Sequence, residues 1–189
     1  MLELHVALIH HPVFDRNKSV VATTITHFDV HDIARVCRSY GVTKYHIVHP
    51  SEGQLMFVER LKEHWTLGFG KAFNPLRAEA IKIIQTSESL KKLKEEVQFD
   101  SVLATSAKNH EGFNNVSFQD LKNEILENKN PENLKKILIL FGTGSGLTRA
   151  IFEQCDGILE PIIGFEGSDF RHLSVRSAVA IVLDRLHRS

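Results

Sequence analysis

Three alternating glycines, Gly142, Gly144 and Gly146, follow an apolar run over residues 135–141. The run is rich in isoleucine and leucine, as expected of a buried strand. Glycine lacks a Cβ atom, so its backbone reaches positive φ and lets another molecule lie against the peptide groups. The pattern suits a loop that binds a nucleotide-like cofactor. It suits a tight strand-to-helix turn about equally well, because such a glycine motif alone is weakly specific.

Polar or glycine-containing segments follow two other apolar runs, at residues 105–108 and 161–164. In parallel α/β sheets, ligands bind beyond the carboxyl ends of the strands. We therefore expect these two segments and the glycine loop to line one site. His10 and His11 end the first predicted strand at the same edge and are candidates for substrate contact.

No metal site is expected. His27 and His31 are four residues apart, a spacing that places two side chains on one helix face, but no third ligand stands out in the sequence. Cys37 and Cys155 are far apart and fit neither a metal-ligand spacing nor a disulfide framework. Both are interpreted as core thiols of a reducing compartment.

Strands and helices alternate along the chain, which predicts an α/β fold with a mostly parallel sheet flanked by helices. Alternating or continuous apolar residues predict the strands, and apolar residues at helical spacing predict the helices. The predicted strands are 2–9, 45–48, 81–85, 100–105, 135–141 and 158–159, and the predicted helices are 29–40, 52–65, a short one from 75, 88–97, one from 117, 148–154 and 174–186.

The bulk composition predicts one globular domain over residues 1–189. Lys plus Arg and Asp plus Glu both number 23, so the formal net charge is zero. This balance argues against an unspecific basic sleeve for nucleic acid but allows a local basic patch. Neither a membrane-spanning run nor a signal peptide is recognisable, so we expect a cytoplasmic protein.

The position of the glycine loop separates two kinds of fold. In Rossmann-like folds the loop follows the first strand, whereas here it comes late, and too few residues follow Leu147 for the remaining strands and crossovers. A P-loop is excluded because no Gly-Lys-Ser/Thr follows the glycines. The sequence instead favours a fold whose cofactor loops all lie near the C-terminus.

Three ordered segments resemble the SPOUT-class methyltransferases, an α/β family with a trefoil knot in its C-terminal part. Residues 28–42 are similar to the first motif of the ribose 2′-hydroxyl branch, and 103–108 resemble its Ala-Thr-Ser-Ala-Arg segment. Residues 140–147, 155–156 and 161–180 resemble the last two motifs. The whole chain is also similar to the small SPOUT domain found attached to some bacterial tRNA guanine methyltransferases.

The resemblance implies that residues 101–189 form the knot and bind S-adenosylmethionine (SAM), with adenine among Leu140, Ile162 and Leu173. It implies a homodimer that methylates RNA, with tRNA or rRNA as the substrate, and a functional role for Arg35, which matches the family's arginine. The residues expected to contact SAM are Ala104, Thr105, Ser106, Leu140, Phe141, Gly142, Thr143, Gly144, Gly146, Pro161, Ile162, Gly164, His172, Leu173 and Ser174.

The chain departs from the family pattern at three places. The glycine loop lacks the usual Glu, His172 replaces a Ser in the third motif, and Asp29 replaces the first-motif Asn. Two functions are therefore considered. The first is a SAM-dependent RNA methyltransferase, and the alternative is a SAM-binding SPOUT module that has no catalysis of its own and assists a partner RNA-modifying enzyme.

Overall fold

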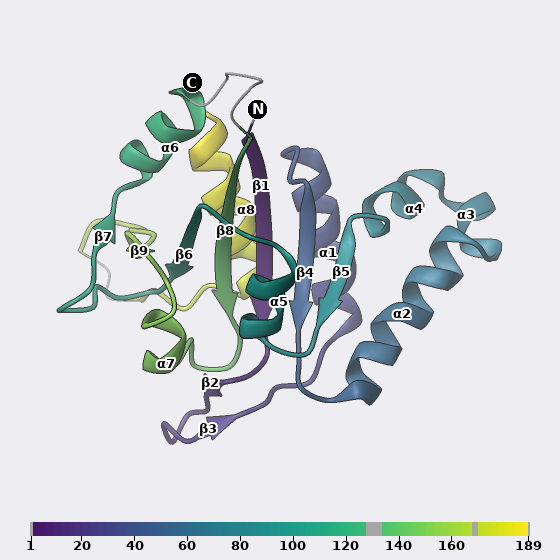
Figure 1. Cartoon of the computed structure of the whole chain (residues 1–189), viewed down its shortest axis with the longest axis horizontal. Helices are drawn as coiled ribbons and strands as arrows, with labels where there is room; N and C mark the ends of the chain where they lie inside the picture. The colour runs from purple at the N-terminus through teal and green to yellow at the C-terminus, as the bar shows by residue number, and fades with distance from the viewer. Residues whose placement is uncertain (1, 128–133, 168–169, 189) are drawn as a thin grey trace.

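The computed structural model describes residues 2–127, 134–167 and 170–188. Within them a parallel sheet has the strand order β5-β4-β1-β8-β6-β9-β7 (Figure 1). The predicted α/β class is confirmed. The sheet strands are β1 (Leu2–Ile9), β4 (Lys44–Val48), β5 (Ile84–Ser87), β6 (Ser101–Thr105), β7 (Asn115–Val116), β8 (Lys135–Gly142) and β9 (Gly157–Leu159).

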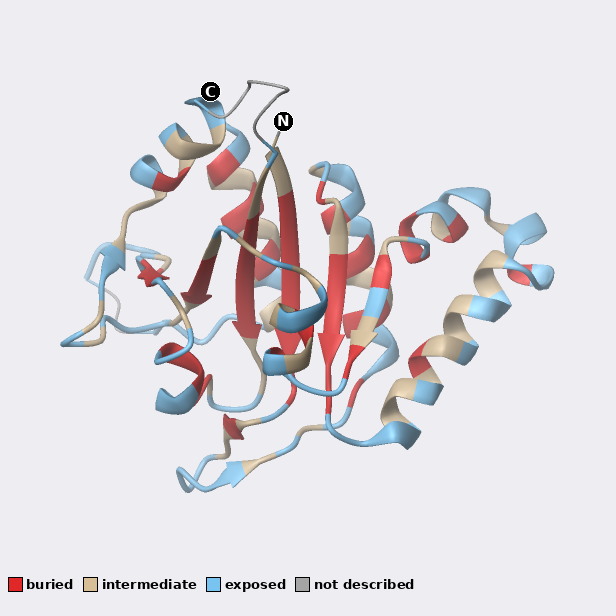
Figure 2. Cartoon of the chain, viewed as in Figure 1, coloured by how far each residue is buried: buried red, intermediate tan, exposed pale blue. Residues whose placement is uncertain are grey.

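Helices cover both faces of the sheet, and their apolar sides form two cores. Leu4, Val6 and Leu8 of β1 face one core, whereas Ala7 and Ile9 face the other, because successive strand side chains point to opposite faces. Figure 2 shows the buried strands between these layers. The helices are α1 (His27–Ser39), α2 (Glu52–Thr66), α3 (Phe69–Phe73), α4 (Pro75–Ile81), α5 (Leu90–Glu96), α6 (Phe118–Glu127), α7 (Arg149–Phe152) and α8 (Val175–His187).

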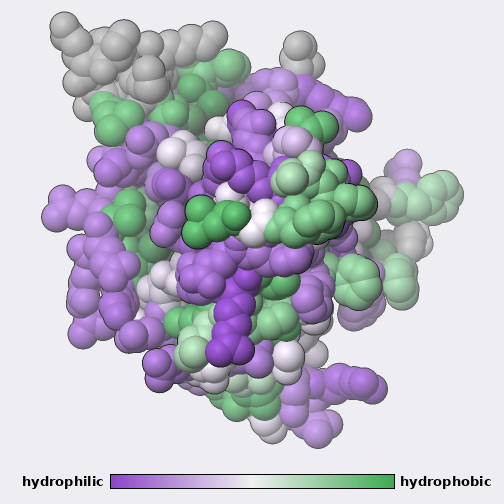
Figure 3. Space-filling model, turned by 90° about the vertical axis from the view of Figure 1, so that its right-hand side faces the viewer, coloured by the Kyte–Doolittle hydropathy of each residue, from purple (hydrophilic) through white to green (hydrophobic). Residues whose placement is uncertain are grey.

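Helices α1 and α8 supply apolar side chains to the first core, and α5 and α7 supply them to the second. Helices α2, α3 and α4 lie beyond the β5 edge (Figure 1). This end of the molecule exposes apolar side chains, among them Leu67, Phe69 and Phe73. Apolar areas are visible between hydrophilic ones in the view of that side (Figure 3).

The strand prediction for residues 81–85 is wrong in position. Ile81 ends α4, and the strand begins at Ile84. The Asn74 side chain accepts a hydrogen bond from the Arg77 amide at 3.0 Å and caps the start of α4, which continues through Ile81. The next helix is capped by Ser89, whose hydroxyl accepts from the Lys92 amide.

Parallel register brings the carboxyl ends of the central strands to one edge. Ile9 of β1 pairs with Gly142 of β8, and Ala104 of β6 pairs with both Leu140 and Ile158. The segments that follow β1, β6, β8 and β9 therefore lie together. Residues 12–19 after β1 are polar and rich in turn-forming residues, which predicts a loop, but the segment contains a small antiparallel pair, β2 (Val13–Phe14) and β3 (Val20–Val21).

None of the described helices is long and apolar enough to span a membrane. The trefoil knot expected within residues 101–189 and the single-domain boundaries 1–189 stay predictions. Residues 128–133 are polar and include a proline, which predicts a turn, but they lie outside the described residues.

Candidate functional site

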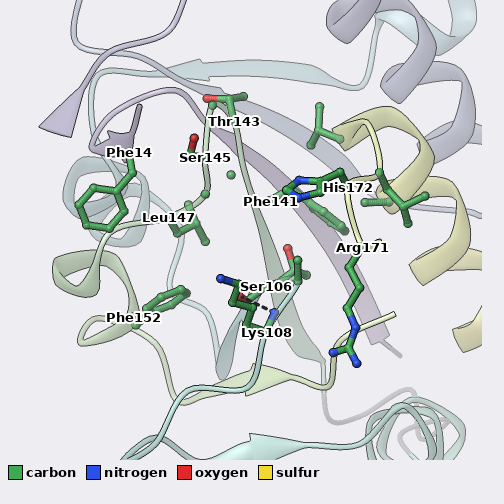
Figure 4. Close-up of a pocket in the computed structure, with 18 of the residues that line it drawn as sticks. Phe14, Ser106, Lys108, Phe141, Thr143, Ser145, Leu147, Phe152, Arg171 and His172 are labelled. Atoms are coloured by element: carbon green, nitrogen blue, oxygen red, sulfur yellow. Dashed lines mark hydrogen bonds between the residues drawn. The ribbon is translucent and has the colours of Figure 1, made fainter. Parts of the chain in front are cut away.

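A cavity of about 1020 Å³ opens at the carboxyl edge of the sheet. Its walls come from the segments that follow β1, β6, β8 and β9, together with the start of α8. Figure 4 shows Ser106 and Lys108 on one side of the cavity, Thr143 and Ser145 on another, and Arg171 and His172 on a third. The three loops that the sequence analysis singles out thus meet in one place.

Most residues expected to contact SAM line this cavity. Ala104 and Leu140 do not, because both are fully buried and face the core beneath α5 and α7. Pro161 is buried and Gly164 is exposed, and neither belongs to the lining. The expected residues that do line the cavity are Thr105, Ser106, Phe141, Gly142, Thr143, Gly144, Gly146, Ile162, His172, Leu173 and Ser174.

Arg35 lies elsewhere. It is exposed on α1 and does not line the cavity of its own chain. Its carbonyl accepts a hydrogen bond from the Ser39 hydroxyl at 2.9 Å. The catalytic role of Arg35 therefore stays a prediction. The residue lies on the surface of α1 and not in the wall of this cavity.

The glycine loop owes two of its glycines to packing within the chain. Gly144 has φ +59°, and a Cβ atom there would lie 2.6 Å from the Phe14 carbonyl oxygen. A Cβ atom at Gly142 would lie 2.9 Å from Leu147. The missing Cβ atoms thus let the loop pack closely against other parts of the same chain. At Gly144 the close neighbour is β2.

A chain of hydrogen bonds runs from the end of β1 to the glycine loop. The Thr143 hydroxyl donates to the Ile9 carbonyl at 3.1 Å, so its oxygen accepts from the Thr23 hydroxyl at 2.5 Å. The Thr23 oxygen in turn accepts from His10 Nδ1 at 3.0 Å. Each hydroxyl has one proton, so these bonds together assign the Nδ1–H tautomer to His10.

His10 is fully buried, and burial lowers its pKa to about 4. The nearby Asp29 carboxylate raises the pKa and His49 lowers it, but both effects are smaller than that of burial. His10 is therefore neutral at neutral pH and able to donate from Nδ1 while its other ring nitrogen carries a lone pair. His10 does not line the cavity. It contributes to the site through its hydrogen bond to the Thr23 hydroxyl.

The segment after β6 is also tied down by hydrogen bonds. Thr105 Oγ1 donates to the Leu140 carbonyl at 2.9 Å, which joins β6 to β8 below the cavity. The Ser106 hydroxyl lies 2.8 Å from His110 Nε2 and accepts from the Lys108 amide at 3.2 Å. Burial lowers the pKa of His110. These contacts hold Lys108 at the cavity wall.

Asp29, at the position of the family's first-motif Asn, is buried and lines the cavity. Its carboxylate accepts from the Thr26 hydroxyl at 2.6 Å and lies 3.4 Å from Arg176 Nη1. Arg176 also pairs with Asp32 at 3.5 Å, so a single guanidinium joins α1 to the first turn of α8. Arg176 was not among the predicted site residues, because nothing local in the sequence marks a residue whose partner is far away in the chain.

Several further lining residues were missed, and they come from two places. Phe14, Arg16, Lys18 and Thr23 belong to the segment after β1. These residues could have been predicted from the sequence, because their segment follows the carboxyl end of a central strand, where ligand contacts are expected. Phe152 belongs to α7 and was interpreted only as part of a helix.

The cavity combines an apolar side with polar groups. Phe14, Leu147 and Phe152 lie together on one side in Figure 4. Hydroxyls, backbone groups and charged side chains occupy the other walls. A site of this size with few convergent polar groups suits a small molecule that has an aromatic ring and a charged end. Within the described residues, no group of three His, Cys, Asp or Glu side chains is placed to hold a metal ion.

Comparison with known proteins identifies relatives. The family described as "SAM-dependent RNA methyltransferase" matches residues 3–188. A protein of Aquifex aeolicus described as uncharacterized is 36% identical over 186 residues, which cover 96% of this chain and 86% of that protein. A tRNA (guanine-N(1)-)-methyltransferase of Nitratidesulfovibrio vulgaris is 37% identical over 188 residues, which cover 97% of this chain and 41% of that enzyme. The chain thus spans less than half the length of the latter relative.

The fold also matches solved structures. The TrmH/SpoU tRNA-modifying enzyme of A. aeolicus superimposes with a TM-score of 0.57 at 15% identity, and the match covers 98% of this chain and 73% of that chain. At this level of identity the match shows only that the two chains share a fold. The resemblance to SPOUT methyltransferases inferred from the motifs is confirmed.

Proposed function

Because the chain belongs to the family of SAM-dependent RNA methyltransferases, we propose that its cavity at the carboxyl edge of the sheet binds SAM and that the chain methylates RNA, with tRNA as the substrate class. The observation that carries the site assignment is the meeting of three motif-bearing loops around one cavity of about 1020 Å³. The relatives named as tRNA methyltransferases support tRNA over rRNA.

The residues present fit SAM. Phe141, Ile162 and Leu173 offer apolar surface for adenine, and the glycine loop offers backbone groups for its polar edges and the ribose. Lys108 and Arg171 can receive the cofactor's carboxylate, and the Asp29 carboxylate can face its amino group. When bound, SAM supplies a methyl group on a positively charged sulfur that is open to attack by a nucleophile.

The role of the protein is to place the RNA nucleophile in line with that methyl group and to help it lose its proton. Arg35 is the candidate for this second task, because a guanidinium can orient a phosphate or stabilise a developing oxyanion. Arg35 is exposed on α1 and outside the cavity of its own chain. In our proposal it acts beside the cavity of a second copy.

This arrangement requires a homodimer, which the exposed apolar side chains near the cavity support. Phe28 at the start of α1 is 67% exposed, and Phe165 is 85% exposed. Ile163 is also exposed. Monomers rarely leave contiguous large apolar side chains in water, so this region is the proposed contact between copies.

The test is calorimetry with SAM combined with transfer of labelled methyl groups to tRNA and to rRNA. We expect saturable SAM binding and labelling of tRNA. L173R should block SAM binding, because Leu173 lines the cavity and is exposed enough for the substitution to spare the fold. L67R is the matched control, since Leu67 is 82% exposed and outside the cavity.

The outcomes separate the two functions considered. Absence of SAM binding by the wild-type chain would contradict the proposal as a whole. SAM binding with no labelling of either RNA would favour the alternative, a module that assists a partner enzyme. Labelling of rRNA alone would keep the methyltransferase and overturn the assignment of tRNA.

A further inference from the structure

The turn between β2 and β3 carries two cations to the mouth of the cavity. Arg16 and Lys18 are both exposed, and both line the cavity. The turn spans residues 15–19 and follows β1 by only a few positions. We call residues 13–21, from β2 to β3, the cationic arm.

The tip of the cationic arm is held in one shape by Asp15. Its carboxylate oxygen Oδ1 accepts hydrogen bonds from the Asn17 and Ser19 amides, both at 2.8 Å. The Asp15 amide donates to the Ser19 carbonyl at 3.0 Å, and the Lys18 amide donates to the Asp15 carbonyl at 3.2 Å. Lys18 has φ +62°, a conformation that these bonds support. The two cations are therefore presented by an ordered turn.

The base of the cationic arm is attached to the glycine loop. The Phe14 amide donates to the Gly146 carbonyl at 2.9 Å, and the Ser145 amide donates to the Phe14 carbonyl at 2.7 Å. Thr23, just after the arm, contacts the Thr143 hydroxyl. The arm thus has a defined position relative to the loop that we assign to SAM.

Two more cations stand on other walls of the same cavity. Lys108 follows β6, and Arg171 precedes α8 (Figure 4). None of Arg16, Lys18, Lys108 and Arg171 forms an ion pair with the part of the chain that the structure describes.

The carboxylates around the cavity are largely engaged within the chain. Asp15 accepts from two amides of its own turn, Asp29 pairs with Arg176, and Glu160 accepts from the Phe118 amide at 2.6 Å. Glu111 is the remaining lining carboxylate. The lining holds five lysine and arginine side chains and four carboxylates, so its formal charge is slightly positive, although the formal charge of the whole chain is zero.

We propose that the cationic arm is the phosphate-binding element of the substrate RNA: Arg16 and Lys18 bind phosphates of the RNA backbone beside the cavity, while Lys108 and Arg171 remain the residues that receive the SAM carboxylate. This inference rests on the proposed function and adds to it the surface that positions the substrate. Phosphate contacts set the register of a nucleic acid on a protein without reading its sequence. An ordered arm joined to the cofactor loop would place the target nucleotide over the methyl donor.

The experiment compares R16E/K18E with K71E/K82E. Lys71 on α3 and Lys82 after α4 are exposed and outside the cavity, so both double variants change the net charge equally. Binding of unfractionated tRNA is measured against salt concentration, and SAM affinity is measured by calorimetry. For R16E/K18E we expect at least about tenfold weaker tRNA binding. We also expect the slope of log binding constant against log salt concentration to become less steep by roughly 0.7–0.9 per lost phosphate contact.

K71E/K82E should change tRNA binding by less than about threefold, because both lysines belong to the α3–α4 end beyond β5, outside the cavity lining, and salt screens charges that are far apart. Equal losses in the two double variants, or no loss in R16E/K18E, would overturn the assignment of the arm. SAM affinity should stay within about twofold of wild type in K71E/K82E, and R16E/K18E should lose less SAM affinity than tRNA affinity. A wild-type chain that fails to bind SAM would instead contradict the proposed function, so the two failures are distinguishable.

Discussion

The Thr23 hydroxyl lies 2.5 Å from the Thr143 hydroxyl, although 120 positions separate the two residues. This contact joins the segment after β1 to the glycine loop after β8, and buried His10 completes it from behind. Because Thr143 lines the cavity, the contact connects a buried histidine to the site proposed for SAM.

Removing the Thr23 hydroxyl should weaken SAM binding. T23V keeps the side-chain shape but leaves His10 without its acceptor and Thr143 without its donor, and a buried polar group that loses its partner costs about 1–3 kcal/mol. Where this cost falls on the SAM-bound state and not on the free protein, each 1.4 kcal/mol should weaken SAM binding about tenfold. T23S, which restores the hydroxyl, should bind nearly as well as wild type, and calorimetry would show the difference.

Gly144 should tolerate alanine less well than Gly41. Both have positive φ, +59° and +69°, so alanine strains the backbone at either position by roughly 1–2 kcal/mol. A Cβ atom at Gly41 meets nothing within 4 Å, whereas at Gly144 it would lie 2.6 Å from the Phe14 carbonyl. Urea denaturation should therefore show a larger loss for G144A than for G41A. Equal losses would mean that the clash with β2 is relieved by movement.

Asp29 should matter more for stability than Asp32, although both face Arg176. The Asp29 side chain is 10% exposed and that of Asp32 is 45% exposed. D29A removes an acceptor of Thr26 and leaves Arg176 with its more exposed partner, and we expect a loss of about 1–3 kcal/mol. D32A removes a largely solvated ion pair, which contributes no more than about 1 kcal/mol. Urea denaturation of the two variants would test this order.

Acid should destabilise the protein through its buried histidines. His46 is hydrogen-bonded to His5 at 2.9 Å, and burial lowers the pKa of His46 to about 3 and that of His10 to about 4. Below the unfolded pKa of 6.5 the unfolded chain binds more protons than the folded one, so stability falls as the pH drops from about 6.5 toward these values.

For each such histidine the slope approaches about 1.4 kcal/mol per pH unit. H46Q should remove one part of this slope between pH 6 and pH 4.5 in urea denaturation. H64Q is the control, because His64 is exposed on α2. An unchanged slope in H46Q would show that His46 is not the group that takes up the proton on unfolding.

Arg35 should affect methyl transfer and not SAM binding. R35A is expected to lower the rate of RNA methylation by about a hundredfold or more, as loss of a transition-state contact does, with SAM affinity near wild type. R60A serves as the control, because Arg60 is an exposed arginine of α2. Mixing R35A with the cavity variant L173R should restore part of the activity if Arg35 of one copy serves the cavity of the other. No restoration would contradict the shared site.

Several elements could be predicted because their signals are local. The apolar alternation of β1, the Asn74-Pro75 start of α4 and the glycines after β8 each depend on neighbouring residues, so their patterns are legible without a structure. Parallel topology followed from the alternation of strands and helices, and the edge at which the loops meet followed from that topology.

Tertiary structure alone decided which side chains meet at that edge. Strand 81–85 was misplaced because Ile81 of α4 and Ile84 of β5 both enter the first core, and a short apolar run does not show where a helix ends and a strand begins. The pairing of β2 with β3, the Thr23–Thr143 contact and the Asp29–Arg176 pair join residues through space, and the last two span more than a hundred positions of the chain. Such hydrogen bonds leave no periodic trace in the sequence, because each partner is a common polar residue whose choice is set by the other.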